Sequence, residues 1–340
     1  MKTIFAFIFS LLASVFLLSG ATLNVPGDYI SIQAAVNAAV AGDIIIVANG
    51  SYNESINLNS MATPGEITIQ AQNAGGATID GGASPAFKAG TFTGAITIEG
   101  FRLDANTGIV NGVIDLLNVS GRVNVINNIF VPGYGGTAIY MLNTTSANTA
   151  LSVLDNTASG AVDNDDFVFV QVGDNGTGGG ATDILIDGNT VSDLEDSGVQ
   201  IDLEGTTYTA TIRISDNNMS NWAASGSGVD FHLGNGSIGT NIEAYLSIEG
   251  NTFTNPDGRG IGLDADGINN SMYVTIADNN LTGNVNSSNG IGLDDDSTSD
   301  GVTVHASITG NTISNFTDSG IWLRPFIAIN IISERSKPNP

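Results

Sequence analysis

The sequence predicts an all-β fold, a right-handed parallel β-helix (solenoid) whose short strands stack coil upon coil behind a short N-terminal capping helix. The first observation is an apolar-x-apolar segment, ending in a turn that contains Asn, which recurs along most of the chain. The second is a Gly-opened segment that follows each of these at a nearly constant distance. The third is composition, since 41% hydrophobic residues with 43 Gly indicate a turn-rich strand protein rather than a disordered chain.

Residues 1–21 have the pattern of a secretory signal peptide. Lys2 gives a positive start, residues 4–18 are almost entirely apolar, and Ser19, Gly20 and Ala21 are small. The alternative is a membrane anchor, but the apolar run is shorter than the roughly 20 residues that a spanning helix needs. We therefore expect a secreted or cell-surface protein that does not insert into a membrane once the signal is cleaved.

Cysteine content indicates how the fold is stabilised, and net charge indicates which binding partners its surface excludes. No cysteine is present, so packing and backbone hydrogen bonds must supply the stability that disulfides give to many secreted proteins. The chain has 34 acidic and 9 basic residues and a formal net charge of −25. Such a surface repels nucleic acid and anionic lipid, and it repels a polyanionic glycan unless a bound cation bridges the two. We expect no nucleic-acid partner.

Residues 22–50 are predicted to cap the open N-terminal end of the solenoid, which would otherwise expose core and unpaired strand edges. Ser31 is a suitable N-cap for a helix over residues 32–39, whose apolar residues lie on one face. Gly42 and Asp43 then turn the chain into the first buried strand, residues 44–47.

Residues 51–324 are predicted to form the coils. The apolar strands end at a recurrent Asn, found at Asn128, Asn156, Asn189, Asn217, Asn251, Asn279 and Asn311, with spacings of 28, 33, 28, 34, 28 and 32 residues. We expect this Asn to occupy a tight corner, to tolerate a left-handed backbone and to bond its copy in the next coil. The Gly-opened strands begin at Gly136, Gly198, Gly228, Gly260, Gly290 and Gly320. Each coil therefore holds at least two strands, and the extra residues of long coils form outer loops, where binding sites are common.

The N-terminal segment resembles a known superfamily. Val25-Pro26-Gly27-Asp28-Tyr29, Ser31-Ile32-Gln33-Ala34-Ala35-Val36, Gly42-Asp43-Ile44-Ile45-Ile46-Val47 and Gly50-Ser51-Tyr52 resemble the cap and first coil of pectate-lyase-like right-handed parallel β-helix proteins. The resemblance implies that fold. It leaves function open, because the fold hosts lyases, glycoside hydrolases, epimerases, phage tailspikes and non-catalytic surface proteins. The catalytic signatures of alginate epimerases, polygalacturonases and classical pectate lyases are not evident in the sequence.

Residues 325–340 depart from the repeat. Pro325 and an apolar run are followed by a polar, partly basic tail without a Gly-Asn corner or an obvious cap. The segment is either a last strand with an irregular tail or a truncated or frame-shifted reading, and the sequence leaves both open.

The Gly-opened strands predict a column of charged residues. Aligning them places Asp202, His232, Asp264, Asp294 and Arg324 at one outward position, with Asp230, Asp266, Asp295, Asp296 and Arg259 nearby. Clustered carboxylates suit Ca²⁺, for which Asp264, Asp266, Asp294, Asp295 and Asp296 are candidate ligands. A lyase would need a base and a neutralised uronate carboxylate, and a glycoside hydrolase two carboxyl groups, with His232, Asp230, Arg259 and Arg324 as candidate catalytic residues. The alternative is a solvated acidic face without a ligand.

Aromatic residues are the remaining candidates for sugar contacts. Trp222 and Trp322, together with Asp202, are predicted to bind substrate, and Tyr208, Tyr245 and Tyr273 could also stack on sugar rings. Single aromatic residues near turns more often serve local packing, and for His305, which enters a strand, we expect a structural role.

These features predict a secreted, monomeric protein that binds or cleaves an extracellular polysaccharide. The sequence leaves open whether the protein is an enzyme. If it is one, a Ca²⁺-dependent polysaccharide lyase is the preferred activity and a glycoside hydrolase the second. A non-catalytic surface or adhesive protein, in which the solenoid is a spacer, is the alternative.

Overall fold

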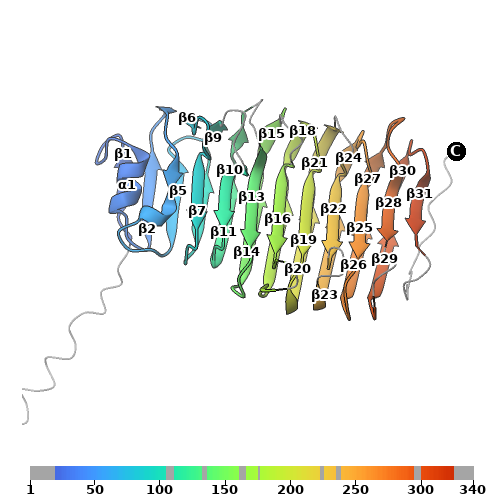
Figure 1. Ribbon diagram of the computed structural model, residues 1–340. Helices are drawn as coiled ribbons and strands as arrows, with labels where there is room; N and C mark the ends of the chain where they lie inside the picture. Colours follow the sequence, from blue (N-terminus) through green and yellow to red (C-terminus); the bar gives the residue numbers. More distant parts are fainter. Residues whose placement is uncertain are drawn as a thin grey trace, which may run out of the picture.

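A computed structural model describes residues 20–104, 111–131, 136–160, 166–174, 177–222, 226–234, 239–294 and 300–324. In these residues the chain forms a solenoid of three parallel β-sheets, with the helix α1 at the N-terminal end (Figure 1). Apart from the two end strands of each sheet, every described strand pairs with its copy one coil earlier and one coil later, so side chains at equivalent positions stack into columns. The predicted fold class is confirmed.

The sheets are named here A, B and C. Sheet A consists of β1 (Thr22–Val25), β2 (Asp43–Val47), β5 (Ile67–Ala71), β8 (Ile96–Glu99), β11 (Gly121–Ile126), β14 (Thr149–Leu154), β17 (Thr182–Asp187), β20 (Thr206–Ser215), β23 (Thr240–Glu249), β26 (Ser271–Ala277) and β29 (Thr303–Thr309). Sheet B consists of β3 (Gly50–Tyr52), β6 (Ala77–Asp80), β9 (Arg102–Asp104), β12 (Ile129–Phe130), β15 (Thr157–Ser159), β18 (Thr190–Leu194), β21 (Asn218–Trp222), β24 (Thr252–Thr254), β27 (Asn280–Thr282) and β30 (Thr312–Ser314). Sheet C consists of β4 (Ile56–Asn57), β7 (Phe87–Gly90), β10 (Gly112–Leu117), β13 (Thr137–Asn143), β16 (Val168–Val172), β19 (Val199–Leu203), β22 (Val229–Leu233), β25 (Ile261–Ala265), β28 (Asn289–Asp294) and β31 (Ser319–Leu323).

The core is built from the inward positions of all three sheets. Along β20, for example, buried and exposed residues alternate, and the buried Ile212 pairs with Ile184 before it and Leu246 after it. The strands of sheet B follow directly after the Asn corners. With two to five residues each they are too short for their alternation to be recognised in the sequence, which is why the repeat predicted at least two strands per coil and the structure has three.

The recurrent Asn residues form a continuous buried ladder. The Oδ1 atom of Asn251 accepts hydrogen bonds from the backbone N–H of Asn217 at 3.0 Å and from its side-chain amide at 2.9 Å. The same pair of bonds links the Asn residues from Asn128 to Asn311. The predicted bond between coils is therefore confirmed. The left-handed residue, however, is the one before the ladder Asn, such as Asp216 with φ of 53°.

The N-terminal cap is confirmed. Helix α1 (Ile32–Ala38) begins after Ser31, whose hydroxyl accepts a hydrogen bond from the Ala34 N–H at 3.1 Å. The carboxylate of Glu54 accepts two further N–H groups of the first turn, those of Ile32 and Gln33. The apolar side of α1 is buried against the first coils, where the short 3-10 helix η1 (Leu58–Ser60) also lies.

Two predictions concern residues outside the described part of the chain. Most of the signal peptide and the whole of residues 325–340 fall there, so both stay predictions. None of the helices described is long and apolar enough to cross a membrane.

Candidate functional site

The outer face of sheet C aligns charged side chains from consecutive coils. Strand pairing places Asp202 of β19 opposite His232 of β22, His232 opposite Asp264 of β25, and Asp264 opposite Asp294 of β28. Arg324 follows β31, whose Leu323 pairs with Leu293 immediately before Asp294. The column is in the order that aligning the repeats predicted, because parallel pairing keeps equivalent positions of successive coils adjacent.

His232 is surrounded by three carboxylates. Its Nδ1 atom lies 2.8 Å from Oδ1 of Asp202, and its Nε2 atom lies 3.6 Å from Asp230 and 3.5 Å from Asp264. The side chain of Asp202 is almost fully buried at 7% exposure, whereas those of His232, Asp230 and Asp264 keep 22 to 28% of their surface exposed. The imidazole is therefore held among acids but remains reachable from solvent.

Two arginines continue the alternation of charge. Arg259 Nη1 lies 2.9 Å from Oδ1 of Asp264, and its Nη2 lies 3.9 Å from Oδ2 of Asp294. Arg324 Nη1 lies 2.9 Å from the other oxygen of Asp294. Asp202, Asp230, His232, Arg259, Asp264, Asp294 and Arg324 are called the His232 cluster below.

Two glycines make room for Arg259. Gly262 and Gly292 follow Asp230 in the same outward column, one and two coils later. A Cβ atom added at either glycine would lie 3.0 Å from Cδ of Arg259. Because both side chains are missing, the arginine side chain lies flat across the two coils and reaches both Asp264 and Asp294.

The environment separates the pKa values of the cluster. Burial alone lowers the pKa of His232, but the hydrogen bonds with Asp202 and Asp264 and the charge of Asp230 outweigh it and raise the pKa to about 10. Burial raises the pKa of Asp230, and the charge of His232 offsets this only in part. Burial also acts to raise the pKa of Asp264, but His232 and Arg259 together hold it below its usual value.

Three consequences follow for the chemistry of the site. His232 is an imidazolium at neutral pH, so it is suited to donating a proton or holding an anion rather than to acting as a base. Asp230 and Asp264 lie beside each other with pKa values pushed in opposite directions, which is the arrangement of an acid–base pair. Finally, ligand atoms of Asp230, His232 and Asp264 lie within 4.8 Å of one another and could hold a metal ion.

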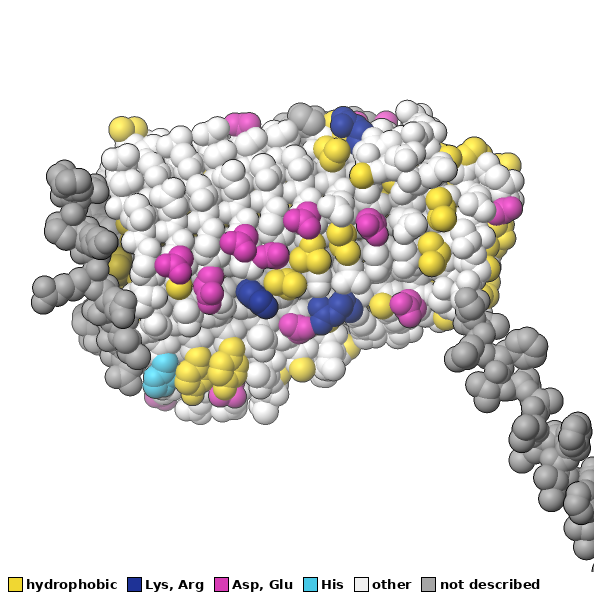
Figure 2. All heavy atoms as spheres, turned by 180° about the vertical axis from the view of Figure 1, so that it is seen from behind, with side chains coloured by type: hydrophobic (Ala, Val, Ile, Leu, Met, Phe, Trp, Pro, Cys, Tyr) yellow, Lys and Arg dark blue, Asp and Glu magenta, His cyan; other side chains and the backbone are white. Residues whose placement is uncertain are grey.

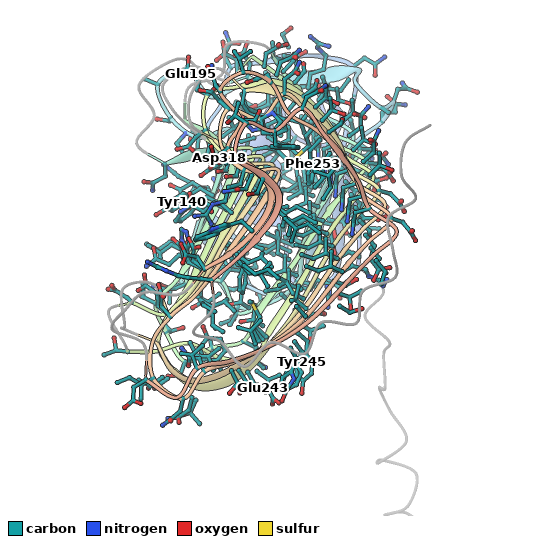
Figure 3. The ribbon with its side chains drawn as sticks, turned by 90° about the vertical axis from the view of Figure 1, so that its right-hand side faces the viewer. Tyr140, Glu195, Glu243, Tyr245, Phe253 and Asp318 are labelled. Carbon is teal, nitrogen blue, oxygen red and sulfur yellow. The ribbon has the colours of Figure 1, made fainter. Side chains whose placement is uncertain are left out.

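An aromatic pair extends the same face toward the N-terminus. The rings of Tyr140 on β13 and Phe169 on β16 stack at 5.1 Å with an angle of 8°. Strand pairing continues from Phe169 through Gln200 to Asp230, so the stack shares a column with the His232 cluster. Tyr140 projects from this side of the solenoid in the view along its axis (Figure 3). Our sequence reasoning missed the pair, although extending the outward column to earlier repeats would have found it.

Other residues with predicted roles lie elsewhere. Trp222 is on β21 in sheet B, is only 6% exposed and packs against Phe253 edge to face at 6.5 Å, which corrects the expectation that its ring is free for a sugar. Trp322 does lie on sheet C, opposite Gly292. Asp266 follows β25 and is 9% exposed, but it does not belong to the described group that could hold a metal. Asp295 and Asp296 lie outside the described residues.

The metal and catalytic roles assigned to these residues stay predictions. The geometry establishes which side chains meet. Asp202, which we expected to contact substrate, is paired with His232 in the structure.

Comparison with known proteins bears on the fold of the chain. No protein-family description and no curated protein matches the chain. Among solved structures, it is similar to a PL6 alginate lyase in complex with a trisaccharide, with 13% identity, a TM-score of 0.50 and coverage of 86% of this chain and 60% of that chain. A mannuronic acid-specific family 6 lyase from the human gut microbiota gives 11% identity, a TM-score of 0.43 and coverage of 93% and 91%. The Streptococcus pneumoniae surface protein and adhesin PfbA has 12% identity and a TM-score of 0.42, with coverage of 88% of this chain and 94% of that chain.

The chain spans about 60% of the length of the first of these structures. At such low identity the likeness concerns the fold alone, and it agrees with the three parallel sheets and the capped N-terminus described above. The chain thus has the parallel β-helix fold that the sequence predicted.

Proposed function

We propose that this protein binds or cleaves an extracellular polysaccharide that lies along the outer face of sheet C, and that acidic sugars contact the His232 cluster. The observation that supports the proposal is that three cationic side chains gather at one place, among four aspartates. A chain with only 9 Lys and Arg residues against 34 acids places Arg259, Arg324 and the protonated His232 along one line of coils. This line offers a uronate several cations close together, whereas Arg122 and Arg213 lie apart from it on sheet A.

The exposure of the cations supports contact with a ligand. The side chain of Arg324 is 41% exposed and that of Arg259 is 25% exposed, and each guanidinium has five N–H donors. The ion pairs of Arg259 with Asp264 and Asp294 use only some of its donors, so this residue can bind a sugar carboxylate without breaking the cluster. The stacked Tyr140 and Phe169 provide an apolar surface for further sugar units in the same column.

For cleavage we propose Asp230 and Asp264 as the groups that transfer protons. The pKa of Asp230 is raised by burial, which suits a proton donor, and the pKa of Asp264 is held low by His232 and Arg259, which suits a carboxylate that stays charged. In a hydrolase the first protonates the leaving oxygen while the second attacks the anomeric carbon as the nucleophile of a retaining mechanism, because carboxylate oxygens within 4.8 Å of each other leave no room for the water of an inverting one. The first, now a carboxylate, then activates the water that releases the sugar. In a lyase a carboxylate takes the proton beside the uronate carboxyl group, whose charge His232 and Arg259 neutralise.

Calcium fits this arrangement less well than the cationic side chains do. Ca²⁺ takes about six to eight oxygen ligands. The group of Asp230, His232 and Asp264 includes an imidazole nitrogen, and its carboxylates already contact His232 and Arg259. We therefore expect a chelator to leave polysaccharide binding unchanged, whereas loss on chelation with recovery in CaCl₂ would support the calcium dependence that the acidic residues predicted.

The proposal is tested with the purified protein against uronate and neutral polysaccharides, with and without chelator. Absorbance of an unsaturated product identifies a lyase, reducing ends without that absorbance identify a hydrolase, and retardation in affinity electrophoresis identifies binding without cleavage. We expect Arg259→Gln and His232→Gln to weaken the interaction with uronate polymers about tenfold or more, since each removes a charge-assisted contact.

Arg122→Gln is the matched control. Arg122 is also paired with an aspartate, Asp183, but it lies on sheet A. The Arg122→Gln variant should leave the interaction with uronate polymers unchanged. No response to any uronate polymer, or equal losses in Arg122→Gln and Arg259→Gln, would refute the proposed site.

The alternative function, a non-catalytic surface or adhesive protein, has one observation in its favour. Asp202, Asp264 and Asp294 each contact a cationic residue, and such alternation of charge stabilises a stack of coils without any ligand. A solenoid that is silent in the cleavage and binding assays, yet loses stability in Arg259→Gln, would favour this function.

A further inference from the structure

A second face of the solenoid has a regular row of aromatic rings. Tyr245 on β23, Tyr273 on β26 and His305 on β29 occupy one outward column of sheet A. Their rings are stacked at 5.0 and 4.9 Å, with interplanar angles of 11° and 6°. Tyr245 Oη donates a hydrogen bond to Glu243 at 2.7 Å, which holds the ring at the N-terminal end of the row.

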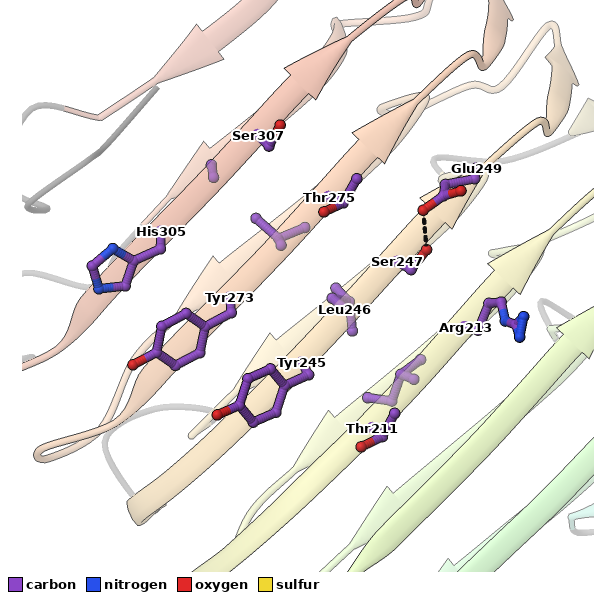
Figure 4. Close-up of a pocket in the computed structure, with 13 residues that line it drawn as sticks. Thr211, Arg213, Tyr245, Leu246, Ser247, Glu249, Tyr273, Thr275, His305 and Ser307 are labelled. Carbon is purple, nitrogen blue, oxygen red and sulfur yellow. Dashed lines mark hydrogen bonds between the residues drawn. The ribbon is translucent and has the colours of Figure 1, made fainter. Parts of the chain in front are cut away.

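A row of hydroxyl groups runs parallel to the rings. Two residues further along the same strands, Ser247, Thr275 and Ser307 pair in register. Figure 4 shows the two rows side by side, with one ring and one hydroxyl from each coil. Together they line a groove of about 690 Å³, called here the tyrosine groove. Because coils repeat about every 4.8 Å, the groove presents the same chemistry at that interval along the helix axis.

The rings are not part of the core. Tyr245 is 41% exposed and Tyr273 is 36% exposed, whereas inward residues of the same strands, such as Leu246 and Ile276, are at most 3% exposed. Apolar ring surface left in water has a free-energy cost that stacking recovers only in part. An ordered row of exposed rings beside a groove is therefore a candidate binding surface.

Charge restricts the ligand to a neutral one. Among the described residues that line the groove, Glu249 and Arg213 are the charged ones apart from His305, and Glu243 accepts the hydroxyl of Tyr245. In the space-filling view acidic side chains are scattered over this side of the molecule and basic ones are few (Figure 2). On a protein with a net charge of −25, such a surface offers a polyanion no adequate countercharge.

Strand pairing argues against an extended peptide. Such peptides commonly bind by adding a strand to a free sheet edge. β20, β23 and β26 are each hydrogen-bonded to a strand on both sides. Among the described strands of the groove only β29 is paired on one side alone, and a peptide added there would extend the sheet beyond the rings instead of covering them. A neutral polysaccharide needs no free edge, because its C–H surfaces contact ring carbons and its hydroxyls bond to hydroxyl groups, and a chain laid along the axis meets both rows at every coil.

We propose that the tyrosine groove is a second carbohydrate-binding surface, which holds a neutral polysaccharide chain parallel to the solenoid axis. It lies on a different side of the solenoid from the His232 cluster, as the positions of Tyr245 and Tyr140 show in the view along the axis (Figure 3). The two faces then serve different polymers. The groove anchors the protein to a neutral glycan while the face of sheet C remains accessible to acidic sugars.

The test is affinity electrophoresis of the purified protein in gels that contain a soluble β-glucan, xylan or galactomannan, with alginate and polygalacturonate in parallel gels. We expect at least one neutral polymer to retard the protein. The variant Tyr245→Ala/Tyr273→Ala should weaken this interaction about tenfold or more, because it removes two aromatic contacts. Tyr273→Phe, which keeps the ring, should retain most of it.

Tyr140→Ala is the matched control, since it removes a stacked tyrosine from sheet C. It should leave retardation by the neutral polymer unchanged, and circular dichroism and thermal melting should show that the variants remain folded. Retardation by none of the neutral polymers would overturn the proposal. So would a neutral-polymer interaction that survives Tyr245→Ala/Tyr273→Ala or is lost equally in Tyr140→Ala. Because uronate polymers report on the His232 cluster separately, failure at one face is distinguishable from failure at the other.

Discussion

Replacing Asn251 by Ala tests whether the Asn ladder holds adjacent coils together. Asn251 is fully buried, and its Oδ1 atom accepts the backbone N–H of Asn217 at 3.0 Å. Its Nδ2 atom donates to the carbonyl oxygens of Ile214 at 2.9 Å and Glu249 at 3.2 Å, and to Asn279 Oδ1 at 3.0 Å. Alanine is small enough for the site but removes all of these bonds at once.

The expected loss of stability follows from the groups that the substitution leaves behind. The Asn217 N–H loses its acceptor and the Ile214 carbonyl loses its amide donor, both in the interior. A buried polar group without a partner costs about 1–3 kcal/mol, so two of them should lower the free energy of unfolding by about 2–6 kcal/mol. Asn251→Asp keeps the acceptor but buries a carboxylate beside two carbonyl oxygens, so its destabilisation should grow as the pH rises and that group ionises.

Urea unfolding followed by far-ultraviolet circular dichroism measures the effect, with the slope of each transition compared so that a loss of cooperativity between coils is detected. The control is Asn124→Ala, because Asn124 lies outward on β11 and its side chain donates to the Thr97 hydroxyl at 3.1 Å. It should change the free energy of unfolding by about 0.5 kcal/mol or less. Equal effects of the two substitutions would refute the argument that the buried ladder stabilises the coil stack.

Three further predictions concern the His232 cluster and the core. The pKa of His232 is raised to about 10 from 6.5, so its ion pairs stabilise the fold fully below pH 6.5 and this contribution is lost as the pH rises toward 10. Melting temperatures measured across this range should therefore fall more steeply for the wild type than for His232→Gln. Parallel curves would contradict the raised pKa. Gly262→Ala should displace Arg259 from Asp264 and weaken uronate binding. The free energy of unfolding should change by only about 1 kcal/mol, because the added methyl group meets the flexible side chain of Arg259. Unchanged binding would show that the position of Arg259 is unimportant. Trp222→Ala should cost about 3–5 kcal/mol of stability in urea unfolding, as expected for a large buried side chain; a mild effect on stability combined with lost polysaccharide binding would instead restore its predicted role as a sugar contact.

Much of the fold could be predicted because a solenoid repeats one local pattern. The buried alternation of the sheet A strands, the Asn corners and the cap formed by Ser31 and α1 are all readable within a few residues of sequence. Once the strands of successive coils are aligned, parallel pairing decides which side chains become neighbours. The column from Asp202 to Asp294 was predictable for that reason, although it comes from four separate strands.

The sequence could not predict what depends on the path of the chain between strands. Burial of Trp222 against Phe253 comes from the third sheet, whose two- to five-residue strands leave almost no alternation to recognise. The left-handed corner lies one residue before the ladder Asn, which differs from the expectation because the side chain of Asn must point inward to bond with its copies.

What the sequence alone determined, then, is the parallel β-helix, its N-terminal cap and the order of charges in the column, because each depends on a repeat period or a local cap. Only the tertiary structure decided how those charges meet. The pairing of His232 with three carboxylates and the position of Arg259 over Gly262 depend on distances between coils. The stacking of Tyr245, Tyr273 and His305 into one row depends on them as well. Coil lengths that vary from 28 to 34 residues conceal these distances in the sequence, whereas stacking at a constant interval makes them nearly equal in space.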